Sequence, residues 1–338
     1  MTGIHSDAPG RVRLGTSDLA VHPLSLGGNV FGWTADEQQS FAVLDAYTAA
    51  GGNFVDTADT YSSWVPGNTG GESESIIGDW LRSRGNRDDL VITTKVGLHP
   101  EARGLGAATI KSSVEGSLRR LGIEHIDLYY THQDDDTPVE EFITALDELV
   151  KEGKVREIAA SNIGAERLAE ALAFSEREGL AAYVAVQPHY NLVSRATFEG
   201  PLADVVAAHG LATVPYYALA SGFLTGKYRL GGGEVASARS EGASRYLADP
   251  RGPKVLEALD TVAAEHEAEI ATVALAWLTT RPTVAAPIAS ARRVEQLPPL
   301  LAAASLRLTP EQLALLDAAS ASPRRGGGAP PGAGSRRG

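Results

Sequence analysis

The chain contains no cysteine. Disulfide bonds, thiolate zinc sites and cysteine nucleophiles are therefore excluded. Basic residues are also in the minority: the chain has 30 of them and 42 acidic residues, which gives a formal net charge of −12. This balance argues against nucleic acid as the main partner, since phosphate binding needs a basic surface.

Long apolar segments and metal-binding patterns are missing as well. No uncharged apolar run reaches the length of about 18 residues that a membrane helix needs, and the first residues, MTGIHSDAPGRVRLG, lack the apolar segment of a signal peptide. We therefore expect a cytoplasmic protein with no membrane partner. The eight histidines are scattered, with no HxH or HExxH pattern. This disfavours a metal-dependent barrel hydrolase, and no metal site is expected.

Short apolar segments rich in β-branched and aromatic residues alternate with segments of helical periodicity. In one of the latter, Ile110, Val114, Leu118 and Leu121 fall on a single helix face. A glycine suited to the left-handed C-cap position often follows the helical segment, as at Gly51, Gly122, Gly153, Gly179 and Gly210. The alternation is typical of βαβ units with a parallel sheet. Strands are predicted near 24–29, 53–58, 90–96, 126–132, 155–161, 183–189, 211–218 and 284–289.

Eight such strands predict a (β/α)8 barrel, of the TIM-barrel type, over residues 1–321. A doubly wound open sheet is the alternative, but the GxGxxG fingerprint of its dinucleotide-binding form is missing after the first strand. Residues 11–22 predict a hairpin that precedes the first strand and could plug the barrel. Two Gly/Ser-rich insertions, 62–74 and 227–246, follow strand ends, and the second is expected to form a lid over a ligand. The Gly/Pro/Arg-rich tail, 322–338, is predicted to be disordered.

Ionisable side chains stand at the predicted carboxyl ends of consecutive strands. Asp56 ends the second strand, Lys95 the third and His132 the fourth, while Tyr61 follows Asp56 in a loop. Because adjacent strands lie about 5 Å apart, these groups are expected to meet at one mouth of the barrel. Taken singly, each has a structural explanation, such as an ion pair, a strand cap or packing. Four together at consecutive strand ends favour a catalytic site.

The chemistry of such a set is specific. Tyrosine is a poor proton donor at neutral pH because its ordinary pKa is about 10. A neighbouring lysine cation favours the phenolate and so lowers that pKa. The buried lysine needs an acid partner, for which Asp56 is available, and a histidine can hold a substrate oxygen by a hydrogen bond. The set is suited to protonating a carbonyl oxygen while a hydride reaches the carbonyl carbon.

Several separated motifs resemble the aldo-keto reductases in the same order along roughly residues 11–320. They are FVDTADTYS, VITTKVG, IDLYYTHQ, VREIAASN, VQPHYN and YYALASGFLTGKY. The resemblance implies a (β/α)8 barrel that reduces an aldehyde or ketone with NADPH, or less often NADH, without metal. It implies Tyr61 as the general acid, with Asp56, Lys95 and His132 completing a tetrad.

The resemblance also implies a set of cofactor contacts. Ser161, Asn162 and Gln187 would hold the nicotinamide carboxamide, and Tyr216 would stack on the nicotinamide ring. The loop that follows the pyrophosphate would supply Leu219, Ala220, Gly222, Leu224 and Lys227. The segment PIASARRVEQLPPL matches the motif at the adenosine end, where Ser290, Arg292 and Gln296 would face the 2′-phosphate and adenine. Arginine pairs bidentately with phosphate, which favours NADPH over NADH.

This chain departs from the family pattern at three points. Ser290 stands where glycine is usual, and Pro299 and Leu300 replace an acid or amide pair that would contact the adenine amino group. The loop YSSWVPGNTGGESE is longer than in many members, which suggests a bacterial-type subgroup with a larger substrate loop.

The substrate is expected to be a small carbonyl compound in an aromatic pocket. Trp33 and Trp64 are the main candidates to line it, with Tyr129 and Phe223 as further ones. For Tyr129, packing in the core is an equal or better explanation. A second function stays open: a cofactor-binding regulatory subunit with little turnover, like the potassium-channel β subunits that share this barrel. NADH as cofactor and a homo-oligomeric assembly also stay open.

Overall fold

The computed structural model describes residues 10–232 and 240–321. The predicted tail, 322–338, and the middle of the predicted insertion 227–246 lie outside the described residues.

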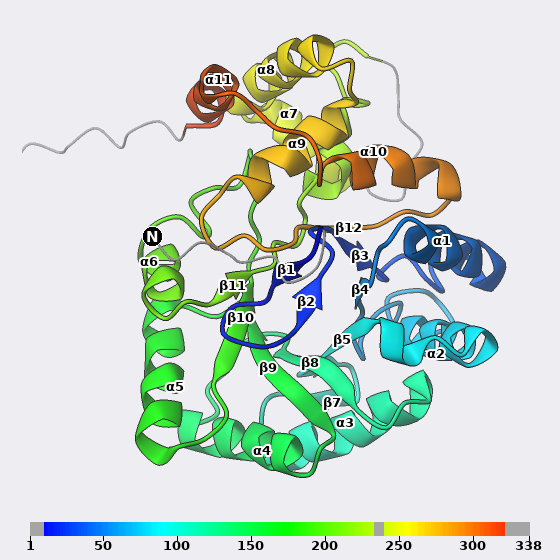
Figure 1. Ribbon diagram of the computed structural model, residues 1–338, viewed down its shortest axis with the longest axis vertical. Coiled ribbons are helices and arrows are strands. Elements are labelled where there is room, and N and C mark those ends of the chain that lie inside the picture. Colours follow the sequence, from blue (N-terminus) through cyan, green and yellow to red (C-terminus); the bar gives the residue numbers. More distant parts are fainter. Residues whose placement is uncertain (1–9, 233–239, 322–338) are drawn as a thin grey trace, which may run out of the picture.

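Eight parallel strands form one curled sheet in the order β11-β10-β9-β8-β5-β4-β3-β12 (Figure 1). The two ends of this order meet, because the amide of Ala285 donates to the Thr213 carbonyl and the amide of Ile288 to the Pro215 carbonyl, both at 2.9 Å. The predicted barrel is therefore confirmed over the open sheet. Its strands are β3 (Ser25–Gly27), β4 (Phe54–Asp56), β5 (Val91–Val96), β8 (Ile126–Thr131), β9 (Val155–Ser161), β10 (Tyr183–Gln187), β11 (Ala212–Thr213) and β12 (Ile288–Ala289).

Helices surround this sheet on its outer side (Figure 1). In α3 the predicted face is confirmed, since Ile110, Val114 and Leu121 are fully buried, and Gly122 ends the helix with a φ of 64°. The α-helices are α1 (Glu37–Ala49), α2 (Glu72–Arg84), α3 (Ala107–Leu121), α4 (Val139–Lys151), α5 (Ala165–Glu178), α6 (Pro201–Ala208), α7 (Ser240–Ala248), α8 (Arg251–Glu265), α9 (Ile270–Thr279), α10 (Leu297–Ala302) and α11 (Pro310–Ser320). Short 3-10 helices are η1 (Arg87–Asp89), η2 (Ala220–Thr225) and η3 (Val294–Gln296).

Most of the barrel strands are shorter than predicted, and the last two are the most strongly reduced. Strand β11 was expected over 211–218 and β12 over 284–289, but each keeps only two residues. Pro215 and Pro287 interrupt these segments, and a proline has no amide hydrogen to donate to a neighbouring strand. The carbonyls of both prolines still accept backbone hydrogen bonds, so the ring of strands stays closed.

The predicted N-terminal hairpin is confirmed. Strands β1 (Val12–Arg13) and β2 (Ala20–Val21) pair antiparallel. Leu14 and Leu19, in the turn between them, are buried in a cluster with apolar residues from several barrel strands, Phe54 at the start of β4 among them. The hairpin thus closes the amino-terminal end of the barrel and leaves the opposite end for a site.

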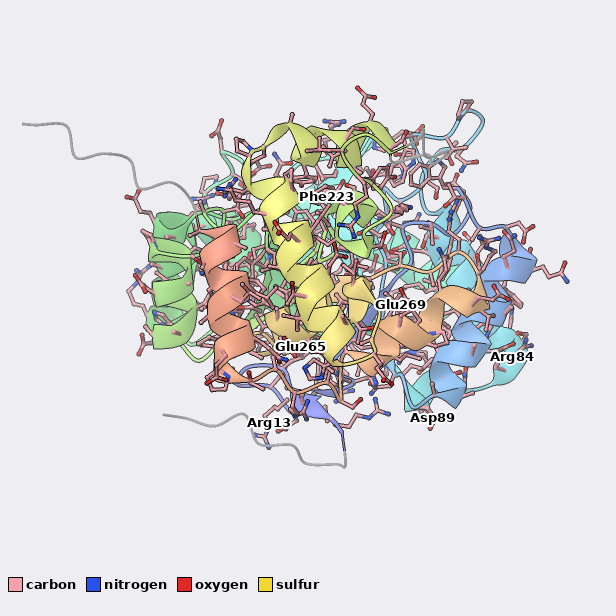
Figure 2. The ribbon with its side chains drawn as sticks, turned by 90° about the horizontal axis from the view of Figure 1, so that it is seen from above. Arg13, Arg84, Asp89, Phe223, Glu265 and Glu269 are labelled. Carbon is pink, nitrogen blue, oxygen red and sulfur yellow. The ribbon has the colours of Figure 1, made fainter. Side chains whose placement is uncertain are left out.

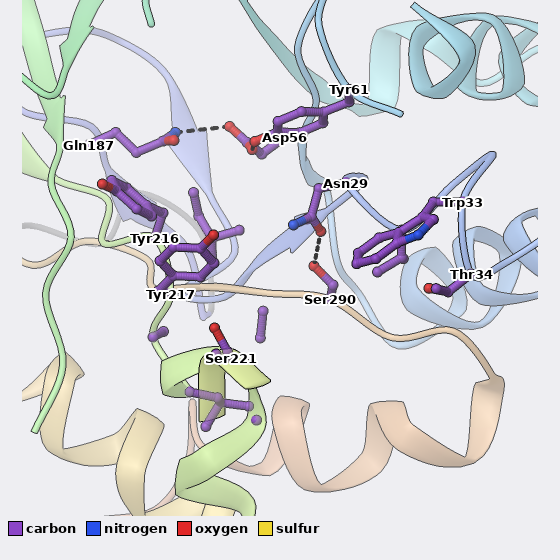
Figure 3. A pocket seen from close by; sticks show the side chains of 18 of the residues that line it. Asn29, Trp33, Thr34, Asp56, Tyr61, Gln187, Tyr216, Tyr217, Ser221 and Ser290 are labelled. Carbon is purple, nitrogen blue, oxygen red and sulfur yellow. Dashed lines mark hydrogen bonds between the residues drawn. The ribbon is translucent and has the colours of Figure 1, made fainter. Parts of the chain in front are cut away.

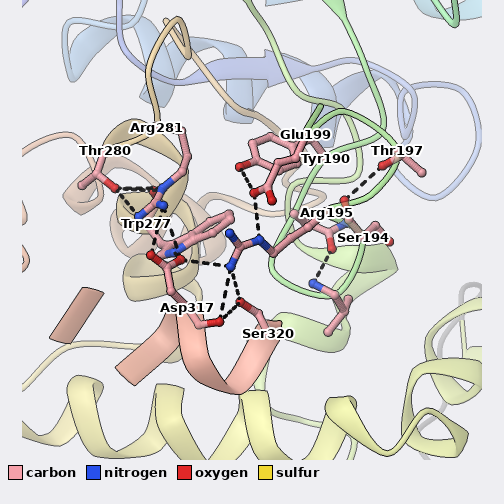
Figure 4. Close-up of polar contacts among 12 residues, drawn as sticks. Tyr190, Ser194, Arg195, Thr197, Glu199, Trp277, Thr280, Arg281, Asp317 and Ser320 are labelled. Atoms are coloured by element: carbon pink, nitrogen blue, oxygen red, sulfur yellow. Dashed lines mark hydrogen bonds and ion pairs between the residues drawn. The ribbon is translucent and has the colours of Figure 1, made fainter. Parts of the chain in front are cut away.

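One carboxylate of the C-terminal helix bonds to several parts of the barrel. Figure 2 shows α11 beside α8, and Figure 4 shows Asp317 of α11 among cationic and aromatic side chains. Asp317 accepts hydrogen bonds from Trp277 Nε1 at 2.9 Å, Arg195 Nη1 at 3.1 Å and Arg281 Nη1 at 3.2 Å. These contacts join α11 to α9 and to the segment that follows β10. No helix of the described residues is long and apolar enough to cross a membrane.

Candidate active site

A cavity of about 810 Å³ opens at the carboxyl ends of the barrel strands. Its lining includes the ends of β3, β4, β9, β10 and β12 together with residues of η2 and α7. Figure 3 shows how these side chains converge from different parts of the barrel. Asp56, Tyr61 and His132 therefore border a single space, whereas Lys95 is buried outside its lining.

Lys95 stands at the centre of the polar contacts beneath this cavity. Its ammonium group is fully buried and donates to both carboxylate oxygens of Asp56, at 2.8 and 2.7 Å. It also donates to the Thr57 carbonyl at 2.7 Å and to the Tyr61 hydroxyl at 3.0 Å. The carboxylate offsets the cost of burying the cation, which would be several kcal/mol without a partner.

Tyr61 reaches this cluster from the turn that follows β4. Its hydroxyl donates to Asp56 Oδ2 at 3.3 Å. The turn is held by Ser62, which has a φ of 70° and whose hydroxyl donates to the Phe31 carbonyl at 2.8 Å. The Tyr61 ring lies 6.0 Å from the His132 ring, centroid to centroid. The loop thus folds back over the strand ends, and the four predicted residues lie together.

The acidic side chains near Lys95 differ in how readily they ionise. Burial lowers the pKa of Lys95, while Asp56, Asp59 and Glu74 act against that shift. Burial, with the neighbouring Glu74, raises the pKa of Asp59 to about 8. Neither Asp59 oxygen has a hydrogen-bond partner among the described residues. Asp59 is therefore mostly neutral near pH 7, which leaves Asp56 as the carboxylate that pairs directly with Lys95.

His132 follows β8, and its amide donates to the Val96 carbonyl at 2.8 Å. Burial lowers the pKa of His132 well below its ordinary value because the charged imidazolium loses its hydration, and the positive charge of Lys95 adds to the shift. The imidazole is therefore neutral at physiological pH and carries one N–H. His132 lines the cavity, and its Nδ1 atom is buried with no hydrogen-bond partner in the described part of the chain.

The first group of predicted cofactor residues forms a hydrogen-bonded chain at the ends of β9 and β10. The Ser161 hydroxyl donates to the Gln187 carbonyl at 2.9 Å. The Asn162 amide donates to the His132 carbonyl at 2.9 Å, and its oxygen accepts from the Tyr216 hydroxyl at 2.7 Å. Asn162 has a φ of 50°, a conformation that asparagine tolerates better than most residues. The Gln187 amide meanwhile donates to Asp56 Oδ1 at 2.9 Å, so this residue contacts the tetrad directly (Figure 3).

The loop after β11 borders the cavity only in part. Leu219, Gly222 and Lys227 line it. Ala220 and Leu224 are fully buried beneath the loop. The backbone turns sharply here, with positive φ at residues such as Tyr217, Ala220 and Ser221.

The predicted adenosine-end residues lie beside the first strand. Ser290, Arg292 and Gln296 line the cavity. The Ser290 hydroxyl donates to Asn29 Oδ1 at 2.7 Å, and the Gln296 side-chain oxygen accepts from the Arg292 amide at 2.8 Å. Pro299 and Leu300 belong to α10, where the Pro299 carbonyl accepts from the Thr272 hydroxyl at 2.7 Å.

The aromatic wall of the cavity is smaller than the sequence suggested. Trp33 and Trp64 line the cavity and meet edge to face, with ring centroids 5.7 Å apart. Tyr129 and Phe223 are fully buried and lie outside the cavity lining. Tyr129 belongs to the main hydrophobic core, as the alternative explanation for it predicted. Including Phe223 as a pocket residue was wrong, because it packs on Tyr246 of α7.

Several lining residues escaped the sequence analysis. Asn29 follows the first barrel strand, Arg103 follows the third, and Tyr217 and Ser221 follow the seventh. Of these, only Asn29 lies directly beyond a strand end, where its position could have identified it; Arg103 and Ser221 lie farther along the loops. The expected lid over 227–246 is described only in part: α7 contributes Glu241 to the cavity lining.

Comparison with known proteins agrees with this geometry. Residues 23–321 match the Aldo/keto reductase family. One relative, a probable voltage-gated potassium channel subunit beta of Oryza sativa subsp. japonica, is 34% identical over 295 residues, which cover 84% of this chain and 88% of the relative. An aryl-alcohol dehydrogenase [NADP(+)] of Phanerodontia chrysosporium is 32% identical over 329 residues, covering 88% and 82%. An uncharacterized oxidoreductase YrpG of Bacillus subtilis (strain 168) is 34% identical over 316 residues, covering 90% and 94%. The chain therefore belongs to the aldo/keto reductase family and has the barrel of an oxidoreductase.

Proposed function

We propose that this protein is an NADPH-dependent reductase of aldehydes or ketones that also oxidises the corresponding alcohols. The observation that carries the proposal is the buried Lys95 ammonium group, which lies within hydrogen-bonding distance of both Asp56 and the Tyr61 hydroxyl. Loss of a proton from a phenol leaves an anion, and an adjacent cation stabilises that anion. Tyr61 is therefore the group best placed to give a proton to a substrate oxygen in this cavity.

The other residues of the cluster prepare that proton transfer. Asp56 holds the Lys95 ammonium group beside the tyrosine and is itself held by Gln187 at 2.9 Å. His132, neutral at physiological pH, donates its N–H to the carbonyl oxygen and orients it toward the Tyr61 hydroxyl. In the reverse direction the Tyr61 phenolate accepts the proton from an alcohol. Proton donation by a positioned side chain typically contributes about 10²–10⁴-fold to a rate.

The cavity suits a reduced nicotinamide dinucleotide. The residues that line it extend from Asn162, beside the tetrad, to Arg292, which follows β12. Lys227 and Arg292 supply the cations that phosphate groups need, and Tyr216 supplies an aromatic ring beside Asn162. When bound, the nicotinamide supplies the hydride. Arg292 favours NADPH because a guanidinium pairs with the additional 2′-phosphate.

The substrate proposed is a small carbonyl compound with an aromatic or other apolar body. Trp33 and Trp64 form a wall that stacks or packs against such a group. A relative named as an aryl-alcohol dehydrogenase supports this choice. A cytoplasmic location remains a prediction of the sequence.

A screen of aromatic and aliphatic aldehydes with NADPH and NADH side by side tests the proposal. We expect loss of the reduced-nicotinamide absorbance with aromatic aldehydes, and a higher kcat/KM with NADPH than with NADH. No turnover across the panel by protein that binds NADPH would contradict the proposed function. It would favour the second candidate, a cofactor-binding regulatory subunit, for which the rice potassium channel subunit beta relative is the supporting observation.

A further inference from the structure

The charged side chains that line the cavity divide into two groups. Lys227 follows η2, Glu241 lies on α7 and Arg292 follows β12, all on the side proposed for the cofactor. Asp56 is neutralised by Lys95. Arg103 also lines the cavity but comes from the segment 98–103, whose His99 lies against Gly70 of the loop that carries Trp64. That loop is on the side proposed for the carbonyl substrate.

A small hairpin holds the backbone of Arg103 in place. Strand β6 (Leu98–His99) pairs antiparallel with β7 (Ala102–Arg103), and Leu98, the partner of Arg103, lines the same cavity. Beside Arg103, the amide of Gly104 donates to the Gly97 carbonyl at 3.0 Å. Both glycines have positive φ, of 92° and 112°, which other residues rarely adopt. The hairpin therefore carries Arg103 on an ordered support.

The guanidinium group of Arg103 is exposed and lacks an acidic partner within the part of the chain that the structure describes. Two acidic residues close to this hairpin in the sequence or the fold have other partners. Asp135 accepts from the amides of Leu105 and Thr137 at 2.8 and 2.9 Å, and Asp134 pairs with Arg167 at 3.1 Å. The chain as a whole is acidic, with a net charge of −12, so an unpaired cation inside its cavity is a departure from the prevailing sign.

A guanidinium group presents planar, paired N–H donors that match a carboxylate. We propose that Arg103 binds a carboxylate on the substrate, so that the preferred substrates are aromatic or apolar aldehydes and ketones that carry a carboxylate away from the reacting carbonyl. Tyr61 and His132 hold the carbonyl oxygen, Trp33 and Trp64 contact the apolar body, and Arg103 holds the acidic end. This substrate class rests on the proposed function.

Matched pairs of acids and esters test the proposal. The probes are 3-formylbenzoate, 4-formylbenzoate and 4-formylcinnamate, each beside its methyl ester, with NADPH and either the wild-type protein, Arg103→Gln or Arg103→Lys. Arg119→Gln is the control, since it removes an exposed arginine on α3 outside the cavity lining. Charge-assisted hydrogen bonds contribute enough for a preference of about tenfold in kcat/KM for at least one acid over its ester.

Arg103→Gln is expected to abolish this preference through the KM of the acid and to leave the ester unchanged. Arg103→Lys should keep part of it, and added salt should weaken it. If every ester equals its acid in the wild-type protein, or if Arg103→Gln keeps the preference, the proposal is overturned. Binding of the same probes in the presence of NADP⁺, measured by titration calorimetry, decides the matter independently of turnover. Failure of the proposed function would remove turnover of acids and esters alike, whereas failure of this inference would remove only the difference between them.

Discussion

Replacing Lys95 by methionine removes the buried cation on which the site depends. Methionine keeps a similar length but loses the donor to Asp56, Thr57 and Tyr61, whose acceptor atoms lie 2.7–3.0 Å from Lys95 Nζ. Asp56 then stays buried as an uncompensated charge, with only neutral donors such as Thr93 at 3.1 Å and Gln187 at 2.9 Å. Breaking a buried ion pair in this way costs about 3–5 kcal/mol. We expect Lys95→Met to lower the free energy of unfolding by that amount.

Asp56→Asn should cost a similar amount because it leaves Lys95 buried without its carboxylate. The double variant, Asp56→Asn with Lys95→Met, contains neither charge, so its cost should fall short of the sum of the single costs by about 2–3 kcal/mol. Urea titrations followed by tryptophan fluorescence measure all four free energies. Additivity within about 0.5 kcal/mol, or a Lys95→Met variant as stable as the wild type, would refute the reasoning.

Three further predictions concern stability and substrate binding. Burial raises the pKa of Asp59 to about 8 in the folded protein. Between roughly pH 4 and pH 8 the unfolded chain has therefore released this proton while the folded protein retains it. The free energy of unfolding falls as pH rises through this window. Asp59→Asn should remove up to about 1.4 kcal/mol per pH unit of that slope, and denaturant titrations that show parallel pH profiles for variant and wild type would count against it. Asp317→Ala should lower the free energy of unfolding in urea by about 1–3 kcal/mol, because three donors lose their acceptor. The control Asp260→Ala breaks an exposed pair with Arg229 and should cost about 1 kcal/mol or less. Equal costs would show that the Asp317 contacts add nothing. Trp64→Ala should raise the KM for aromatic aldehydes several-fold and leave the Kd of NADPH unchanged, because the ring is 49% exposed at the cavity and packs on Trp33 and Tyr61; a change confined to the melting temperature would exclude the pocket role.

The convergence of the candidate tetrad could be predicted from sequence because it follows from topology. The carboxyl ends of neighbouring parallel strands meet at one end of a barrel. Asp56, Lys95 and His132 stand at three such ends, and Tyr61 follows the first of them closely enough to fold back. The strand segments themselves were visible as apolar runs separated by helical periodicity.

The surroundings of the tetrad could not be predicted in the same way. Barrel strands are buried on both faces, so their sequences do not alternate between polar and apolar residues in a way that would identify the side chains that point into the barrel. Tyr129 and Tyr130 are both fully buried for this reason, on opposite faces of β8. Glu74 gave no signal either: it lies on α2 but is buried, where it accepts from Thr94 at 2.5 Å.

The loops were the least predictable part of the site. Composition identified the long connections after the second and seventh strands but not the short hairpin that places Arg103 at the cavity. A loop's path depends on contacts with distant residues, such as the bond between the Leu105 amide and Asp135 at 2.8 Å, which local sequence patterns do not report.

The proton donated by Tyr61 is the central claim, and single-turnover reduction of an aromatic aldehyde by Tyr61→Phe with bound NADPH tests it most directly. The variant keeps the ring but loses the hydroxyl that lies 3.0 Å from Lys95 Nζ. We expect the rate of reduced-nicotinamide oxidation to fall about 10²–10⁴-fold, with the Kd of NADPH unchanged. A variant that oxidises NADPH at the wild-type rate would contradict the account.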